Sequence, residues 1–386
     1  MKANVGSSIL KDSFEAGVEI VRNSTKGLKI PKVGFLFTST KYEQVEVLKG
    51  IKSVEPNLKV IGCTSSGAIM TPAGIISNDD GYAGMLVIED NELIVGVASL
   101  PRGNDPRLTG RRVAKMAMDN AGKKHSPVAF AMFATPGEEE YYLKGIQDVL
   151  GEVPMFGGTA SDDNIVGEWK VFSDEESHED GVAIALIYTN KEIKTIFDGK
   201  YTETENMGII TKVDDGRTIV EIDNKPALKK YAEWIGQNAD DLIGDKLWEI
   251  STLKPLAIKS LQGDVLAIRQ PITGNEDYTF EVNTIVAEKT ALIQMENDQD
   301  GLIGGAVEAI RELDEESNIG AMILVHSGFR KMNIDERIDE DFVAIKNAVG
   351  DLPFIVLFSF NEYGQMNHSG ATIGALSLSF TGFSER

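Results

Sequence analysis

The sequence has one cysteine, four histidines and no long apolar run. Cys63 alone cannot form an intramolecular disulfide or a cysteine zinc site. His125, His178, His326 and His368 are scattered without the spacing of metal ligands, so we expect no metal and no bound cofactor. No apolar run approaches the roughly 18 residues of a membrane span, and the N-terminus lacks the apolar core of a signal peptide. We therefore expect a cytoplasmic protein without membrane insertion.

Basic residues are also scarce, since 38 Lys and Arg stand against 60 Asp and Glu and give a net charge of −22. Nucleic acids and anionic membranes are polyanions, so a protein surface with this net charge does not favour binding to them. The 386 residues with 42% hydrophobic content are enough for two or three globular domains of about 150 residues. The composition predicts a soluble protein with ordinary apolar cores.

The N-terminal half contains two similar segments. The matched pairs are LKGI at 48–51 with 143–146 and GCTSSG at 62–67 with GGTASD at 157–162, both offset by 95 residues, and then 79–95 with 179–195, offset by 100. This period exceeds the roughly 20–50 residues of solenoid repeats. It predicts two αβ units, about 7–100 and 102–200, packed as halves of one domain. We expect the equivalent loops 62–67 and 157–162 to face one cleft.

The pattern changes after residue 205, where 208–227 alternates like a hairpin with Asp215 and Gly216 at its turn. Strands rich in β-branched residues follow, and a new helix–strand–helix–strand unit begins near residue 300. We therefore predict an N-terminal domain over 1–205 and a C-terminal domain over 206–386 with a β-rich start. The fold class is α/β, with α+β mixed character.

Two familiar loop motifs are incomplete in this chain. Gly62 and Gly67 have the spacing of a phosphate loop, but Ala68 and Ile69 follow where Lys and Ser or Thr should stand. A serine-nucleophile elbow fails as well, because residue 63 is cysteine rather than glycine. The sequence therefore predicts neither a Walker-type nucleotide site nor a serine hydrolase.

What remains in these loops is hydrogen-bonding chemistry. The residues concerned are Thr64, Ser65 and Ser66 in the first loop and Gly158, Thr159, Ser161, Asp162 and Asp163 in the second. Small hydroxyls and free amides at a glycine turn suit a polar ligand with amine or carboxylate groups. The same residue types also make ordinary turns. The occurrence of such a loop in both segments favours a ligand site.

The C-terminal half offers a second polar group of residues. Arg330 follows a buried strand, where a guanidinium can hold a carboxylate with two hydrogen bonds. Asn361, Glu362, Gln365 and His368 cluster within 360–370. We predict that Arg330, Asn361, Glu362 and His368 contribute to ligand binding, with a structural Arg330–Glu362 ion pair as the alternative.

These motifs carry a family resemblance. FGGTASDD at 156–163, followed by VFSDEESHEDGVAIALIY at 171–188, resembles the FIST N domain, and GCTSSG resembles its earlier glycine loop. LAIRQPI at 266–272, HSGFR at 326–330 and FSFNEYGQMNHSGATIGALSLSF at 358–380 resemble the FIST C domain. Two positions depart from the family pattern. Ser327 stands where the family often has Cys, and Gln365 where it often has Glu.

The resemblance implies a prokaryotic sensory module of signal transduction that binds small ligands such as amino acids. Family members are often fused to kinase or other output domains. This chain leaves no residues for such a domain, so we expect a small polar ligand and a separate signalling partner, or signalling through oligomerisation. An enzyme, a hydrolase or transferase using Cys63 or Asp162, is the alternative, and a structural scaffold is the second. We expect no catalysis, because the sequence has no matched acid/base pair.

Overall fold

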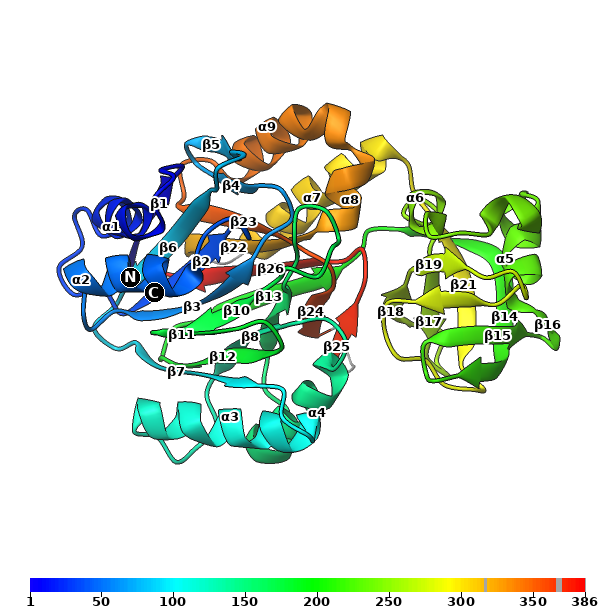
Figure 1. Cartoon of the computed structure of the whole chain (residues 1–386), viewed down its shortest axis with the longest axis horizontal. Coiled ribbons are helices and arrows are strands. Elements are labelled where there is room, and N and C mark those ends of the chain that lie inside the picture. The colour runs from blue at the N-terminus through cyan, green and yellow to red at the C-terminus, as the bar shows by residue number, and fades with distance from the viewer. Residues whose placement is uncertain (316–317, 366–369, 386) are drawn as a thin grey trace.

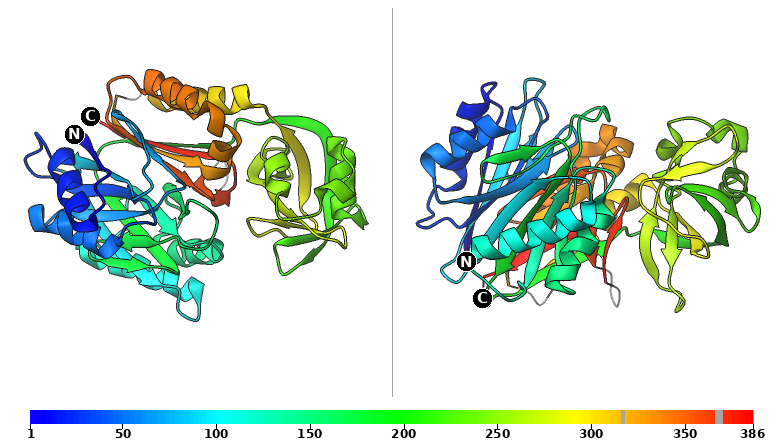
Figure 2. Two further views of the ribbon diagram at one scale, coloured as in Figure 1. Left: turned by 45° about the horizontal axis from the view of Figure 1, so that its top comes forward. Right: turned by 60° about the horizontal axis from the view of Figure 1, so that its bottom comes forward.

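The structure is a computed structural model that describes residues 1–315, 318–365 and 370–385. It consists of a large α/β body, built from both ends of the chain, and a smaller β-rich lobe from its middle, here called the small lobe (Figure 1). The small lobe lies beside the large body in further views as well (Figure 2). The mixture of helices and strands confirms the predicted α/β class.

Among the described residues, three sheets form the large body, and each has six strands. The first contains, in order, β1 (Lys2–Ser8), β6 (Ala83–Glu89), β2 (Val33–Thr38), β3 (Lys59–Thr64), β10 (Val171–Ser173) and β11 (Glu176–His178). The second contains β7 (Ile94–Pro101), β12 (Gly181–Tyr188), β8 (Ala129–Ala134), β9 (Met155–Thr159), β24 (Glu362–Gln365) and β25 (Ala371–Gly374). The third contains β13 (Ile193–Asp198), β26 (Leu378–Ser384), β22 (Ile319–Ser327), β23 (Phe354–Ser359), β4 (Ile69–Thr71) and β5 (Gly74–Ile76).

The three sheets exchange hairpins. The hairpin β4–β5 follows β3 in the chain but pairs with β23 of the third sheet. In the same way β10–β11 follows β9 but pairs with β3, and β24–β25 follows β23 but pairs with β9. Each sheet is therefore completed by a segment from another part of the chain. This exchange ties residues beyond 299 to the N-terminal half in one body.

In the part of the chain that the structure describes, two helices cover the outer face of each of these sheets. They are α1 (Ser13–Ser24) with α2 (Gln44–Val54), α3 (Pro106–Ala121) with α4 (Glu139–Leu150), and α7 (Gln299–Asp314) with α9 (Ile338–Val349). Asp12, Asp105 and Asp298 precede the first helix of each pair, and each side chain accepts a hydrogen bond from the backbone N–H three residues further on. Such caps satisfy N–H groups that have no partner within the helix. None of the helices in the described ranges is both long and apolar enough to cross a membrane.

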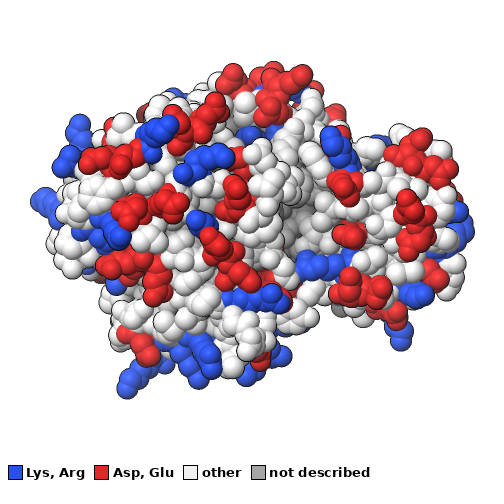
Figure 3. Space-filling model, in the orientation of Figure 1, with Lys and Arg blue, Asp and Glu red and all other residues white. Residues whose placement is uncertain are grey.

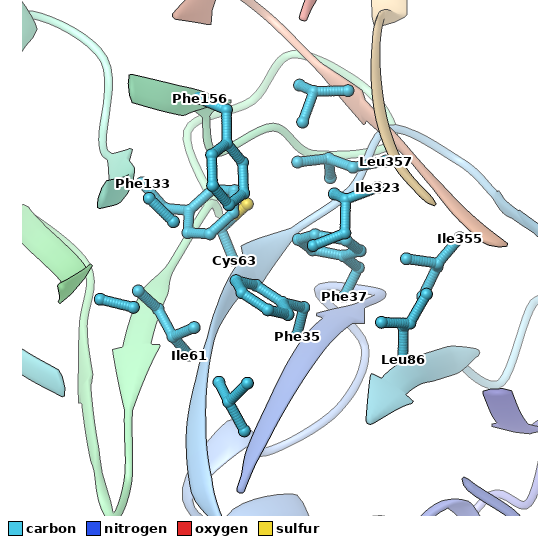
Figure 4. Packing of buried hydrophobic residues seen from close by; sticks show 14 of the residues in the cluster. Phe35, Phe37, Ile61, Cys63, Leu86, Phe133, Phe156, Ile323, Ile355 and Leu357 are labelled. Atoms are coloured by element: carbon cyan, nitrogen blue, oxygen red, sulfur yellow. The ribbon is translucent and has the colours of Figure 1, made fainter. Parts of the chain in front are cut away.

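The inner faces of the three sheets share one core. Its residues include Phe35, Phe37, Cys63, Phe133, Phe156, Ile323 and Leu357, which come from all three sheets and point toward one another (Figure 4). The ring centroids of Phe37 and Phe133 lie 5.5 Å apart in an edge-to-face arrangement. Removing this apolar surface from water stabilises the contact between the sheets.

The small lobe contains the predicted hairpin, with its turn at Asp215 and Gly216. Its elements are β14 (Thr202–Asp214), β15 (Thr218–Ile222), β16 (Lys225–Pro226), α5 (Ala227–Ile235), a 3-10 turn (Ala239–Leu242), α6 (Leu247–Ser251), β17 (Leu256–Lys259), β18 (Val265–Arg269), β19 (Pro271–Gly274), β20 (Phe280–Val282) and β21 (Ala291–Glu296). Asp215 and Gly216 both have positive φ, as the turn requires. The change of pattern near residue 205 marks entry into this lobe. Residues 299–385 return to the large body, so the expected C-terminal part 206–386 contributes to both bodies.

Candidate functional site

The ends of three parallel strand pairs meet at one place. Thr64, Thr159 and Ser359 occupy the last paired position of β3, β9 and β23. The amide of Ser161 donates to the carbonyl of Thr64 at 3.1 Å, and the amide of Thr159 donates to the carbonyl of Asn361 at 2.8 Å. The two loops paired in the sequence therefore lie together, joined by a third loop from the C-terminal half. Gly62 to Thr64 and Gly158 to Thr159 belong to the strands rather than to the loops.

The hydroxyl-bearing residues at this junction are buried, and the hydroxyls of Thr64, Ser65 and Ser161 are hydrogen-bonded within the protein. Thr64, Ser65 and Ser161 have no exposed surface, and Ser66 is 2% exposed. The hydroxyl of Ser65 donates to the carbonyl of Ala68 at 2.6 Å. The hydroxyl of Ser161 donates to a main-chain carbonyl of β23 at 2.6 Å. These side chains hold the three loops together in the described arrangement.

Glycine is required at 158 by close packing. A Cβ at Gly158 would lie 2.8 Å from the Cβ of Ser359 and 2.9 Å from a methyl carbon of Val325. Because both neighbours are buried in the third sheet, a larger residue would push that sheet away. Glycine at position 158 therefore allows the second sheet to pack closely against the third.

Two predicted acids shape the loop that follows β9. Asp162 accepts hydrogen bonds at one oxygen from three consecutive amides, those of residues 166–168, at 2.7–3.0 Å. Asp163 accepts from the amide of Gly67 at 2.7 Å and from the hydroxyl of Tyr82 at 3.2 Å. Asp163 therefore ties the first glycine loop to the second, and Asp162 fixes the turn between β9 and β10.

Arg330 lies in α8 (Gly328–Asn333) and is completely buried. Its guanidinium donates to the carbonyl oxygens of Gly199 at 2.7 Å, Leu302 at 2.8 Å and Leu376 at 3.1 Å. These carbonyls belong to segments far apart in the sequence, so Arg330 joins them. The expected bidentate site for a ligand carboxylate is occupied by main-chain carbonyls in this structure.

Glu362 is also fully buried. Its carboxylate accepts from the amide of Ser377 at 2.8 Å and from the hydroxyl of Ser359 at 3.0 Å. Burial raises its pKa well above the usual range, and the charge of Arg330 opposes that shift from a distance. The fourth residue predicted in this group, His368, lies outside the described residues.

A buried carboxyl that the sequence did not single out lies beside the junction. Glu139, 1% exposed at the start of α4, accepts at one oxygen from Thr159 Oγ1 at 3.1 Å and from Asn361 Nδ2 at 3.2 Å. The hydroxyls of Thr159 and Tyr363 lie 2.7 Å apart. Burial, followed by the charge of Glu140, raises the pKa of Glu139 to about 7. Acids are common in first helical turns, so its position in a run of three glutamates gives no sign of this burial.

A cavity with a volume of about 480 Å³ lies between the large body and the small lobe. Its lining is formed by Thr195, Ile196, Phe197, Asp198, Gly199, Tyr201, Glu203, Gly263, Asp264, Val265, Ala267, Ile268, Met295, Glu312, Gln365 and Ser377. We call this cavity the junction pocket. A hollow between the two bodies, with acidic residues on both, is visible on the face shown in Figure 3.

Arg330 and Glu362 support the walls of the junction pocket without lining it. Arg330 donates to the carbonyl of the lining residue Gly199, and its guanidinium carbon lies 5.7 Å from the ring centroid of Tyr201. Glu362 accepts the amide of the lining residue Ser377. Arg330 and Glu362 therefore lie directly behind this pocket, whereas Asn361 lies beside Glu139 at the strand-end junction. The predicted residues of 64–66 and 158–162 lie at the strand-end junction instead.

Two reactive groups considered for catalysis are not exposed. Cys63 is completely buried in the central core, and burial raises the pKa of its thiol well above the usual value. Asp162 is held by the three amides described above. Within the described ranges, no three His, Cys, Asp or Glu side chains are grouped so that they could hold a metal ion.

Comparison with known proteins gives a family match over nearly the whole chain. The FIST N domain model matches residues 32–225, and the FIST C domain model matches residues 227–365. An uncharacterized protein of Methanocaldococcus jannaschii is 22% identical over 355 residues, which cover 84% of this chain and 67% of that protein.

Two solved structures from Thermotoga maritima are also similar over 99% of this chain. They are phosphoribosylformylglycinamidine synthase II, at 10% identity, 72% coverage of that chain and a TM-score of 0.23, and PurL complexed with ADP, at 8%, 71% and 0.24. TM-scores this low support no inference about function.

Proposed function

Because this chain belongs to the FIST family of signalling-related sensory domains, we propose that it is a sensor that binds a small polar ligand in the junction pocket. The proposal rests on one observation, which is that residues of both bodies line the pocket. Its volume of about 480 Å³ falls within the range of small-molecule sites. A ligand that touches both bodies changes their relative arrangement to the extent that it binds one arrangement more tightly.

The lining of the pocket favours a ligand that carries a positive charge beside an apolar part. Four carboxylates line it, those of Asp198, Glu203, Asp264 and Glu312. Lys200 pairs with the first and last of these, and Lys259 pairs with Glu203. The carboxylates therefore outnumber their lysine partners. An ammonium group, as in an amino acid or an amine, suits this surface, because opposite charges attract strongly in a partly enclosed site.

The apolar part of the lining comes from both bodies. Phe197 belongs to β13 of the large body, whereas Ala267, Ile268 and Met295 belong to the small lobe. All four are at most 5% exposed. A hydrocarbon portion of the ligand would contact these side chains, while its ammonium group meets the carboxylates. We propose that the resulting change in the bodies' arrangement is read by a separate cytoplasmic signalling protein.

The test is thermal unfolding of the purified protein with a panel of amines, amino acids and organic acids. A ligand at 100 times its dissociation constant adds about 2.7 kcal/mol to the free energy of unfolding. Thr195→Trp fills the pocket from the half-buried edge strand β13, and Thr218→Trp is the matched control on β15. We expect one chemical class to shift the melting temperature of the wild type and the control but not that of Thr195→Trp. A shift that survives in Thr195→Trp would place the ligand elsewhere.

The complete burial of Cys63 in the central core supports a binding role over catalysis by its thiol. An enzyme would turn over a ligand found in the panel. Mass spectrometry of that ligand after incubation with the wild type separates the two functions, because a sensor returns it unchanged. A scaffold protein would show neither a thermal shift nor turnover.

A further inference from the structure

We propose that an ionic latch, formed by Arg217 on Glu140 and Glu139, holds the small lobe against the large body, and that the bodies pivot about paired linkers at Lys200 and Asn297 when it opens. This conformational device goes beyond the proposed ligand site. The three latch residues do not line the junction pocket.

The linkers form a narrow connection. The chain enters the small lobe after Asp198, the last residue of β13, and leaves it after Glu296, the last residue of β21. The two crossings touch, because the side-chain amide of Asn297 donates to the carbonyl of Lys200 at 2.9 Å. Lys200 has a φ of 53°, which is a left-handed backbone conformation, and the chain turns at this residue. Two adjacent crossings define a natural pivot.

An apolar contact lies close to this pivot. Phe329 and Phe360 of the large body share one cluster with Ala257, Ile268 and other residues of the small lobe. The ring centroids of Phe329 and Trp248 lie 5.5 Å apart, and Tyr201 in the linker packs against the same cluster. This apolar contact can therefore be kept while the two bodies separate at the end where Arg217 lies.

The latch lies away from the linkers along β14. That strand begins at Thr202, beside the linker, and ends at Asp214, just before Arg217. The guanidinium of Arg217 donates to Glu140 Oε2 at 2.9 Å and to the carbonyl of Gly137 at 3.0 Å. It lies 3.7 Å from Glu139 Oε2. One small-lobe side chain thus contacts three groups around the start of α4.

The latch is partly shielded from water. The side chains of Arg217, Glu140 and Glu139 are 26%, 17% and 1% exposed. Charge pairs in such surroundings are screened less than surface pairs. Without Arg217, Glu140 and Glu139 would lose the cation that pairs with them across the contact between the two bodies. Both carboxyls belong to the large body, so removing Arg217 removes this charge attraction between the two bodies.

Two further polar contacts surround the latch. The amide of Ile285 donates to the other oxygen of Glu140 at 2.8 Å. Asn283 Nδ2 donates to Asn361 Oδ1 at 2.5 Å. Glu139 accepts from Asn361 and from Thr159, so the latch is bonded directly to the strand-end junction. A change in that junction would therefore alter the latch through a chain of hydrogen bonds.

The experiment measures the distance between the two bodies. The native Cys63 is completely buried, so cysteines placed at the exposed helical positions Lys115 on α3 and Glu233 on α5 can be spin-labelled selectively. Double electron–electron resonance then gives the distance distribution. We expect a single narrow distribution for the labelled parent and a longer, broader one for Arg217→Ala. An unchanged distribution in Arg217→Ala overturns the proposal.

The matched control is Arg337→Ala. Arg337 has a side chain 31% exposed and pairs with Glu340 and Asp300, both within the large body. It should leave the distribution unchanged, and a change as large as that of Arg217→Ala would contradict a specific latch. Glu140→Gln keeps an acceptor for the Ile285 amide but removes the charge. It should broaden the distribution without loss of folding, which circular dichroism checks, and no broadening in a folded Glu140→Gln protein also overturns the proposal.

Discussion

His326 Nε2 lies 3.9 Å from Asp341 Oδ2, and both side chains are fully buried between β22 and α9. Neither oxygen of Asp341 has a hydrogen-bond partner among the described residues. Burial raises the pKa of Asp341 to about 7, although the charge of Arg330 opposes this shift. Burial and then the charge of Arg330 lower the pKa of His326 to about 3. The fold therefore favours the uncharged form of both groups.

Asp341→Asn should stabilise the protein in alkaline solution. The folded-state pKa of Asp341 lies above its unfolded value of 3.8, so the native state holds the extra proton and loses stability as pH rises from 3.8 through about 7. The variant avoids this loss, and its free energy of unfolding at pH 8 should exceed that of the wild type by roughly 2–4 kcal/mol. Denaturant unfolding at pH 5 and pH 8 measures the difference. The exposed neighbour Asp339→Asn is the control, and a variant less stable than wild type at pH 8 would refute this account.

Glu139→Gln should flatten the dependence of stability on pH. The pKa of Glu139 is raised from 4.5 to about 7, so this carboxyl also contributes stability that declines as pH rises through that window. The shift corresponds to a contribution on the order of 3 kcal/mol. We expect the largest gain relative to wild type at pH 8 and none at pH 5. Glu43→Gln, at the exposed start of α2, should leave the pH profile as it is. A profile as steep as wild type in Glu139→Gln would contradict the raised pKa.

Arg330→Met should destabilise the whole molecule. It removes the donors to the carbonyls of Gly199, Leu302 and Leu376 and leaves three buried acceptors without them. The expected loss in the free energy of unfolding is about 3–5 kcal/mol. Arg311→Met, at an exposed position of α7, should cost less than about 0.5 kcal/mol. Urea denaturation compares the two, and equal stabilities would show that Arg330 does not join these segments.

Gly62→Ala should be strongly destabilising, because a Cβ there would lie 1.6 Å from the carbonyl oxygen of Leu36 in the neighbouring strand. The strands must separate to admit it, at a cost of roughly 2–4 kcal/mol. Gly304→Ala is the matched control, since its Cβ would meet nothing within 4 Å in the middle of α7. That variant should gain about 0.5–1 kcal/mol from helix propensity. Thermal melts of the two proteins should move in opposite directions.

Local elements were predictable because their signals are local. The hairpin predicted over 208–227, with its turn at Asp215 and Gly216, is formed by β14 and β15. Strand ends were less certain, since Gly62 to Thr64 continue β3 instead of forming a loop. Backbone pairing with β2 and β10 extends that strand through residues whose types favour turns.

The site was only partly predictable. Thr159 and Asn361 were singled out for their hydrogen-bonding groups, and both contact Glu139, a residue that nothing in the local sequence distinguishes. Arg330 and Glu362 were expected beside a ligand but lie behind the wall of the junction pocket. Burial and hydrogen-bond partners depend on segments distant in the chain, and a single sequence does not record them.

The sequence by itself determined the α/β class, the FIST family membership and the hairpin that turns at Asp215 and Gly216, because apolar periodicity and motif residues act over a few neighbours. The tertiary structure alone decided that hairpins pass between sheets, that residues 299–385 return to the N-terminal half, and that Arg217 meets Glu140. These contacts join residues tens to hundreds of positions apart. Their free energy comes from packing and pairing that exist only once the whole chain is folded.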